Sequence, residues 1–161
     1  MTGFELEDIS GMIGQYAHGN EPSHHLAYLF DFAGQPYKTQ FYAHQIMSGF
    51  YKNEPDGLIG NEDCGQMSAW YVMSAMGIYP VCPGKPIYEI GTPIFDKIKI
   101  RLENGKSFII TANNVSDENF YIQSAEFNGK KYEKYYIQHS EIMKGGNLNF
   151  KMDKSANKNW G

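Results

Sequence analysis

The sequence predicts an α+β protein in which a helical segment is followed by an antiparallel, β-sandwich-like segment. Apolar residues in the first half recur at helical spacing, whereas in the second half they alternate with charged residues. The pattern changes between Pro80 and Pro86, a stretch that also contains Pro83 and Gly84. We therefore expect two domains, over residues 1–80 and 81–161.

Three helices are predicted in the first half. The first covers residues 23–33 and ends at Gly34, and the second begins at Pro36 and runs to about residue 51, because proline suits the first turn of a helix. The third covers residues 65–76. The residues expected to face the core are Leu26, Leu29, Phe30 and Ala33 in the first helix, Phe41, Ile46 and Phe50 in the second, and Met67, Trp70, Tyr71 and Ser74 in the third. The short connections predict antiparallel neighbours.

Strands are predicted in the second half. Apolar and charged residues alternate over residues 94–103, which is typical of a strand with one buried face. Asn104-Gly105 and Asn128-Gly129 follow such stretches and are strong signals for hairpin turns. We also expect a short helix capped by Ser140 and a final strand over residues 148–152.

The composition excludes several classes of protein. The chain has 161 residues, of which 42% are hydrophobic and 20% charged, as in ordinary folded proteins. A net charge of −4 argues against a nucleic-acid partner, which selects clustered Lys and Arg. No stretch approaches the roughly 20 apolar residues of a membrane-spanning helix, and the N-terminus lacks the pattern of a secretory signal. Cys64 and Cys82 are too few for a disulfide scaffold or a structural zinc site.

Two polar clusters precede predicted helices. Residues 19–25 read Gly-Asn-Glu-Pro-Ser-His-His, and residues 60–65 read Gly-Asn-Glu-Asp-Cys-Gly. Asn, Asp and Ser are preferred helix caps, so capping alone explains either cluster taken singly. The helix between them, however, brings both clusters to the same end of the helical layer. Two acidic loops that meet there repel each other unless a cation or a substrate lies between them.

Together with residues 33–36 (Ala-Gly-Gln-Pro) and 66–72 (Gln-Met-Ser-Ala-Trp-Tyr-Val), these clusters resemble glycoside hydrolase family 92, whose members are exo-acting, inverting α-mannosidases. Residues 91–97, 128–130 and 157–160 also resemble the C-terminal end of that family. The likeness covers nearly the whole chain beyond about residue 16. It implies that the helices come from an incomplete (α/α)6 barrel that packs on β-sandwich material.

The resemblance implies a catalytic carboxylate in the second cluster. Asp63 is expected to be the general base, because an inverting enzyme needs a carboxylate that activates water opposite the leaving group. Glu62 is its neighbour and ranks second, since adjacent residues at the start of a helix point in different directions. The competing interpretation of Asp63 is a simple helix N-cap.

The resemblance also implies a calcium ion that binds the 2- and 3-hydroxyls of mannose and distorts the ring. Glu21 and Asn20 are expected to contact this ion, because calcium selects oxygen donors, although Glu21 as a capping carboxylate is the alternative. Asn61 and His24 are expected to contact the substrate. His24 and His25 lack a third ligand for zinc, so one of them is expected to bond the neighbouring loop.

In the family the general acid is a glutamate in an earlier motif, which no segment of this sequence matches. We therefore expect this chain to be the C-terminal portion of a calcium-dependent α-mannosidase and to be inactive alone. The parent enzyme is expected to remove terminal, α-1,2-linked mannose from glycans. By resemblance the parent protein works outside the cytoplasm, in the periplasm, on the surface or as a secreted protein. Exposed helix faces are expected to favour self-association. The alternative is a free-standing carbohydrate- or calcium-binding module built on the strands.

Overall fold

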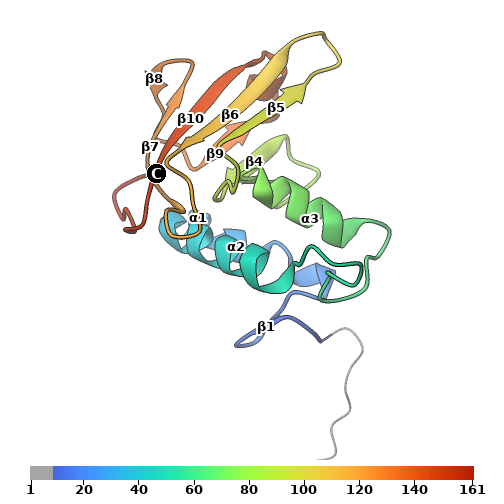
Figure 1. Cartoon of the computed structure of the whole chain (residues 1–161). Coiled ribbons are helices and arrows are strands. Elements are labelled where there is room, and N and C mark those ends of the chain that lie inside the picture. Colours follow the sequence, from blue (N-terminus) through green and yellow to red (C-terminus); the bar gives the residue numbers. More distant parts are fainter. Residues whose placement is uncertain (1–8) are drawn as a thin grey trace, which may run out of the picture.

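The computed structural model describes residues 9–161 (Figure 1). The helices lie at one end of the molecule and a five-stranded sheet at the other, with a three-stranded sheet between them (Figure 1). The predicted α+β class, with helices first and strands after them, is confirmed. The origin of the helices in a barrel stays a prediction. Along residues 9–161 no helix has the length and apolar character needed to span a membrane.

The helical half begins with a small hairpin and contains two 3-10 turns and three α-helices. These elements are β1 (Met12–Ile13), β2 (Tyr16–Ala17), η1 (Glu21–Ser23), η2 (Leu26–Tyr28), α1 (Leu29–Phe32), α2 (Pro36–Phe50) and α3 (Gln66–Ala75). The second and third predicted helices correspond to α2 and α3. Proline occupies the first turn of α2, as expected.

The prediction of one continuous helix over residues 23–33 is wrong in both extent and orientation. The segment consists of η1, η2 and the short helix α1, and it buries Tyr28 and Asp31 while Leu29 is 41% exposed. Tyr28 determines this orientation, because its hydroxyl donates to Ser74 Oγ at 2.8 Å and its ring stacks on Tyr79. Asp31 follows three residues later on the same helical face and is buried with it.

The buried faces of α2 and α3 are predicted more accurately. Ile46 is buried in α2, but Phe41 is 41% exposed, which corrects its assignment to the core. Met67 and Trp70 of α3 are fully buried, as is Ser74, while Tyr71 is half-buried. The apolar spacing therefore identified the helices but did not reveal which apolar residues of α2 are buried.

The strand half contains two sheets and one short helix. The three-stranded sheet has the order β3 (Ile78–Tyr79), β4 (Ile87–Ile90), β9 (Tyr136–Gln138), and the five-stranded sheet has the order β5 (Lys97–Arg101), β6 (Ser107–Asn113), β10 (Gly146–Asp153), β7 (Tyr121–Phe127), β8 (Lys130–Lys131). Helix α4 spans His139–Met143. Both predicted hairpins are confirmed: Asn104-Gly105 lies between β5 and β6, and Asn128-Gly129 between β7 and β8.

Two details of the strand half differ from the prediction. Strand β10 pairs with β7 in antiparallel fashion but with β6 in parallel, so the larger sheet is mixed. The chain permits this because α4 separates β9 from β10 and lets the last strand enter between two earlier ones. The cap of α4 is Gln138 rather than Ser140, and the Gln138 backbone N–H donates to Glu141 Oε2 at 3.0 Å.

Each half has a hydrophobic core of its own, and the two cores adjoin. One is built from both sheets, the other from the helices, and Met73 packs against both. The halves are also joined by Gln40 of α2, whose Oε1 accepts the Ile122 backbone N–H at 2.9 Å, and by His44, whose ring stacks on Phe120 at 4.1 Å. The proposed domain boundary at residue 80 stays a prediction, and β3 and β4 of one sheet lie on either side of it.

Candidate functional site

The loops of the two polar clusters lie against each other. A Cβ atom on Gly60 would stand 2.9 Å from the Cα of Gly19, which is closer than real Cβ atoms approach, so glycine permits this contact. Asn20 and Asn61 follow these glycines directly in the sequence. The predicted convergence of the two clusters at one end of the helical layer is therefore confirmed.

A buried imidazole, that of His18, lies behind this contact. Its Nδ1 is 2.7 Å from the Tyr16 hydroxyl oxygen, and its Nε2 is 2.6 Å from the Tyr51 hydroxyl oxygen. The Tyr51 hydroxyl donates its proton to the carbonyl oxygen of Met67 at 3.0 Å. Because this hydroxyl has only one proton, its oxygen accepts from His18, which therefore carries a proton on Nε2.

The His18 ring is neutral at physiological pH. Burial, with a smaller contribution from the nearby His24 ring, lowers the pKa of His18 to about 3. A neutral ring protonated on Nε2 has an acceptor at Nδ1, so the Tyr16 hydroxyl donates to it. Burial also raises the pKa of the Tyr16 and Tyr51 hydroxyls, which therefore stay protonated. The three side chains form a hydrogen-bonded chain without net charge.

His24 connects the first cluster to the start of α3. Its Nε2 donates to the carbonyl oxygen of His18 at 2.9 Å, and its Nδ1 lies 3.2 Å from the side-chain nitrogen of Gln66. The His24 carbonyl oxygen accepts from Trp70 Nε1 at 3.1 Å. The expectation that one of the two histidines bonds the neighbouring loop is thus confirmed. His24 is 1% exposed and its contacts are to protein groups, while its role in substrate binding stays a prediction.

Glu62 caps α3. Its Oε1 accepts the Ser68 backbone N–H at 2.9 Å and its Oε2 accepts the Ser68 hydroxyl at 2.6 Å. These two bonds lower the pKa of Glu62 and keep it ionised. Ser68 is the third residue of the helix, where backbone N–H groups lack an intrahelical partner. The capping role considered for this cluster therefore belongs to Glu62.

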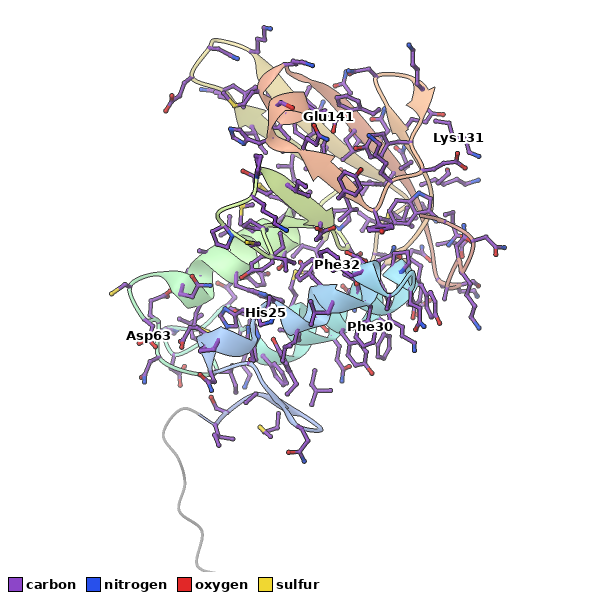
Figure 2. All side chains as sticks on the ribbon, turned by 180° about the vertical axis from the view of Figure 1, so that it is seen from behind. His25, Phe30, Phe32, Asp63, Lys131 and Glu141 are labelled. Carbon is purple, nitrogen blue, oxygen red and sulfur yellow. The ribbon has the colours of Figure 1, made fainter. Side chains whose placement is uncertain are left out.

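Asp63 is exposed and is not the helix cap, because the residue at the N-cap position of α3 is Gly65. Its φ is +46°, and those of Cys64 and Gly65 are +57° and +91°, so three successive residues have left-handed backbone. For a residue other than glycine this conformation costs about 1–2 kcal/mol. Such strain is concentrated at functional sites. Figure 2 shows Asp63 on the loop before α3, at the edge of the helical half.

The remaining predicted residues carry oxygen donors and belong to the same two loops. Asn20 and Asn61 are exposed, and Glu21 is half-buried, with almost no exposed area on its Oε1. Carboxylate and amide oxygens suit calcium in kind. Within residues 9–161, however, no three His, Cys, Asp or Glu side chains lie close enough to hold a metal ion by themselves. Glu21 and Asn20 therefore fit as part of a ligand set that other oxygens must complete.

Sequence reasoning missed His18 and Tyr51. A single histidine before the first cluster and a tyrosine after α2 form no recognisable spacing, since 33 residues separate them. The signal that was available is the position of His18 in the sequence, directly before the Gly19–His25 motif. Only the folded chain reveals that both ring nitrogens of His18 are bonded.

Comparison with known proteins places this geometry in a known context. The sequence matches the glycosyl hydrolase family 92 catalytic domain over residues 2–154. A solved family GH92 α-mannosidase from Bacteroides thetaiotaomicron has 46% sequence identity and a TM-score of 0.90, covering 93% of this chain and 20% of that chain. Its complex with mannoimidazole gives a TM-score of 0.91 over 95% of this chain and 20% of that chain.

Two further relatives extend the comparison. A second family GH92 enzyme from Bacteroides thetaiotaomicron, an inverting mannosidase, has a TM-score of 0.86 at 46% identity over 91% of this chain and 20% of that chain. An uncharacterized secreted glycosidase from Arthroderma benhamiae is 34% identical over 146 residues, which are 89% of this chain and 19% of the relative. The chain thus spans about a fifth of the length of these relatives.

Proposed function

The chain belongs to glycosyl hydrolase family 92, and from that premise we propose that it supplies the general-base side of the active site of an exo-acting, inverting α-mannosidase. One observation supports this proposal above the others. The Gly60 loop with its two acidic residues lies directly against the Gly19 loop with its oxygen donors. Such a rim brings together a carboxylate for water activation and donors for a cation and sugar hydroxyls.

Asp63 is the proposed general base and Glu62 its supporting neighbour. The carboxylate of Asp63 is exposed on a strained loop, where a water molecule has access to it. Glu62 is ionised and accepts two hydrogen bonds from Ser68, so it fixes the start of α3 next to Asp63. In an inverting reaction the base takes a proton from water while that water attacks the anomeric carbon.

Asn61 and His24 are the proposed substrate-binding residues. Asn61 is exposed beside Asp63, and its amide can exchange hydrogen bonds with a sugar hydroxyl. His24, which is buried, holds Gln66 and Trp70 at the foot of the same loop. We propose mannose-containing glycans with a terminal α-1,2 linkage as the substrate.

Calcium is the proposed cofactor, with Glu21 and Asn20 among its ligands. When bound, the ion would hold sugar hydroxyls and favour a distorted ring. The chain's own contribution would be to orient these two oxygen donors, since Asn20 follows Gly19 directly and Glu21 begins η1. The general acid is proposed to lie outside this chain, so the 161-residue polypeptide alone should not hydrolyse mannosides. We propose an extracytoplasmic location, in line with the secreted relative.

The test uses the full-length enzyme, by which we mean the product of the uninterrupted reading frame that contains this chain. Asp63→Asn should lower kcat about 100- to 10,000-fold on aryl α-mannosides, since general-base catalysis contributes that much. A good leaving group should not restore the rate, because protonation of the leaving group is the task of the other carboxyl. Proton NMR of the first product should show β-mannose, the outcome of inversion.

Asp56→Asn is the matched control, because Asp56 is exposed in the same connection between α2 and α3. It should leave kcat unchanged. Asp63→Asn with full activity would refute the assigned base, and retention of configuration would refute the mechanism. Tight binding of mannose by the 161-residue chain alone, measured by calorimetry, would favour the binding-module alternative instead.

A further inference from the structure

We propose that His18 is a positioning residue of this site: its hydrogen bonds to two tyrosines hold the Asn61–Asp63 loop in place against the Asn20–Glu21 loop. The inference rests on the proposed function and extends it to a residue that lies behind the rim. His18 is 0% exposed, so it acts through other residues and does not touch the substrate.

The first connection runs through the imidazole ring. Tyr16 of β2 donates to Nδ1, and Nε2 donates to Tyr51, which follows α2 directly. Tyr51 then donates to the carbonyl oxygen of Met67 in the first turn of α3. The hairpin before the first cluster is thereby bonded, through one ring, to the helix that the second cluster begins.

The second connection runs through the backbone of His18. Its carbonyl oxygen accepts from His24, whose other ring nitrogen bonds the side chain of Gln66. Gln66 and Met67 are the first two residues of α3, so both connections reach the same turn. Two separate attachments fix the direction of that turn as well as its position.

The ring is also packed so that it cannot turn away. Its centroid lies 4.6 Å from that of His24 in a stacked arrangement and 4.5 Å from that of Trp70 in an edge arrangement. The loop that it supports has an exposed outer surface, from Asn61 to Cys64. The shape of this loop therefore depends on the residues beneath it. A shift of about 1 Å in a catalytic group can cost about 100-fold in rate.

The requirement at position 18 is for an N–H donor at the position of Nε2, which bonds Tyr51. Glutamine places an amide N–H near the position of Nε2 and can donate to Tyr51, whereas asparagine reaches only the position of Nδ1. In the full-length enzyme, Tyr51→Phe and His18→Asn should each lower kcat at least 10-fold and change KM less than 3-fold. His18→Gln should recover most of kcat. Because glutamine is also larger than asparagine, the comparison needs His18→Met, which matches glutamine in length but has no N–H. His18→Met should stay as slow as His18→Asn, and its difference from His18→Gln distinguishes bonding to Tyr51 from simple filling of space.

Tyr88→Phe is the matched control, because Tyr88 also bonds a histidine Nδ1, that of His139, at 3.1 Å in the strand half. Its kcat should equal that of the unmodified enzyme. If Tyr51→Phe and His18→Asn retain kcat within twofold, or if His18→Gln is no better than His18→Asn, the proposal is overturned.

Hydrogen exchange on the 161-residue chain tests, independently of activity, whether the bonds of His18 hold the loop before α3. Tyr51→Phe should speed amide exchange at least 10-fold at residues 66–69, whose N–H groups are hydrogen-bonded to the loop before α3, and leave β6, β7 and β10 unchanged, with Tyr88→Phe again as the control. Unaltered exchange at residues 66–69 would overturn the proposal. If the unmodified full-length enzyme lacks mannosidase activity, the proposed function fails while this exchange result still decides whether His18 holds the loop.

Discussion

The helical half and the strand half bury different kinds of residue. Among the described residues before position 80, the buried polar side chains are His18, His24, Asp31, Thr39, Gln40 and Ser74. After it they are Glu89 and Thr92, and the core of the strand half is otherwise apolar. A buried polar group needs a partner and restricts the structure to one arrangement. In the half that carries the candidate site, His18, His24, Gln40 and Ser74 have such partners, so hydrogen bonds help to specify its structure.

The helical half, which buries more polar groups, also exposes more apolar side chains. Large exposed apolar residues gather on the helical half, where they are Ile9, Met12, Leu26, Leu29, Phe32, Phe41 and Val72, whereas the described strand half has Phe95. An apolar groove of about 330 Å³ lies on the helical half between Ile13, Leu26 and Phe30. Figure 2 shows Phe30 and Phe32 on this half. The strand half completes its own core, and the helical half presents surface suited to further protein.

The largest effect on stability is expected in the apolar core of the strand half. Phe150→Ala in β10 should lower the free energy of unfolding by about 3–5 kcal/mol, because Phe150 is 0% exposed and its loss leaves a cavity. Urea denaturation followed by circular dichroism measures this loss. Phe95→Ala, at a site 51% exposed, should change stability by less than about 0.5 kcal/mol. Equal effects of the two substitutions would contradict the contrast between core and surface.

The connection between the halves should be the next most sensitive feature. Gln40→Leu removes the acceptor of the Ile122 N–H and should lower the free energy of unfolding by about 1–3 kcal/mol, the cost of an unpaired buried donor. Gln45→Leu, at an exposed position of α2, serves as the control and should have little effect. A stable Gln40→Leu variant would show that packing alone joins the halves.

Asp31 offers a gain of stability in the helical half. Burial raises the pKa of Asp31 to about 9, from 3.8, so the folded chain binds a proton between these values that the unfolded chain has released. Stability contributed by this group therefore falls as pH rises from about 4 to about 9. Asp31→Asn, which resembles the neutral acid, should stabilise the protein by about 1–2 kcal/mol at pH 8 and by almost nothing at pH 4.

Thermal unfolding at the two pH values measures this difference. Glu89→Gln should act in the same direction but less, because burial raises the pKa of Glu89 only to about 7. If Asp31→Asn destabilises the protein at pH 8, Asp31 is ionised and paired in the fold, and the account of its burial is wrong.

The smallest effect concerns the exposed apolar face. Phe32→Ser, at a side chain 61% exposed, should leave folding intact and lower the tendency to self-associate. Static light scattering at several concentrations measures the change in mean mass. The control is Phe95→Ser, on the strand half, which should leave the mass unchanged. An equal response to both would show that general hydrophobicity drives association.

Local signals predicted much of this fold. Asn104-Gly105 and Asn128-Gly129 specify their hairpins because tight turns need positive φ, which Asn128 and Gly129 adopt at +51° and +75°. Proline at the start of α2 and the apolar face of α3 were equally informative. The family motif located the two clusters, and their contact is confirmed.

Features that depend on distant partners could not be predicted. Leu26 and Leu29 have helical spacing, but Tyr28 is the residue that finds a partner in Ser74, 46 residues later. The parallel pairing of β10 with β6 likewise has no local signal. His18 is the clearest case in the site, since its importance lies in hydroxyls that approach from two separate elements.

The order of strands in the larger sheet has a consequence for biosynthesis. Of the five strands of this sheet, β10 leaves the ribosome last, yet it lies at the centre, between β6 and β7. Until residues 146–153 emerge, both neighbours present open edges and the hydrophobic core lacks Leu148 and Phe150. Nascent chains would thus expose two aggregation-prone edges, and folding of this sheet must wait until β10 has been synthesised.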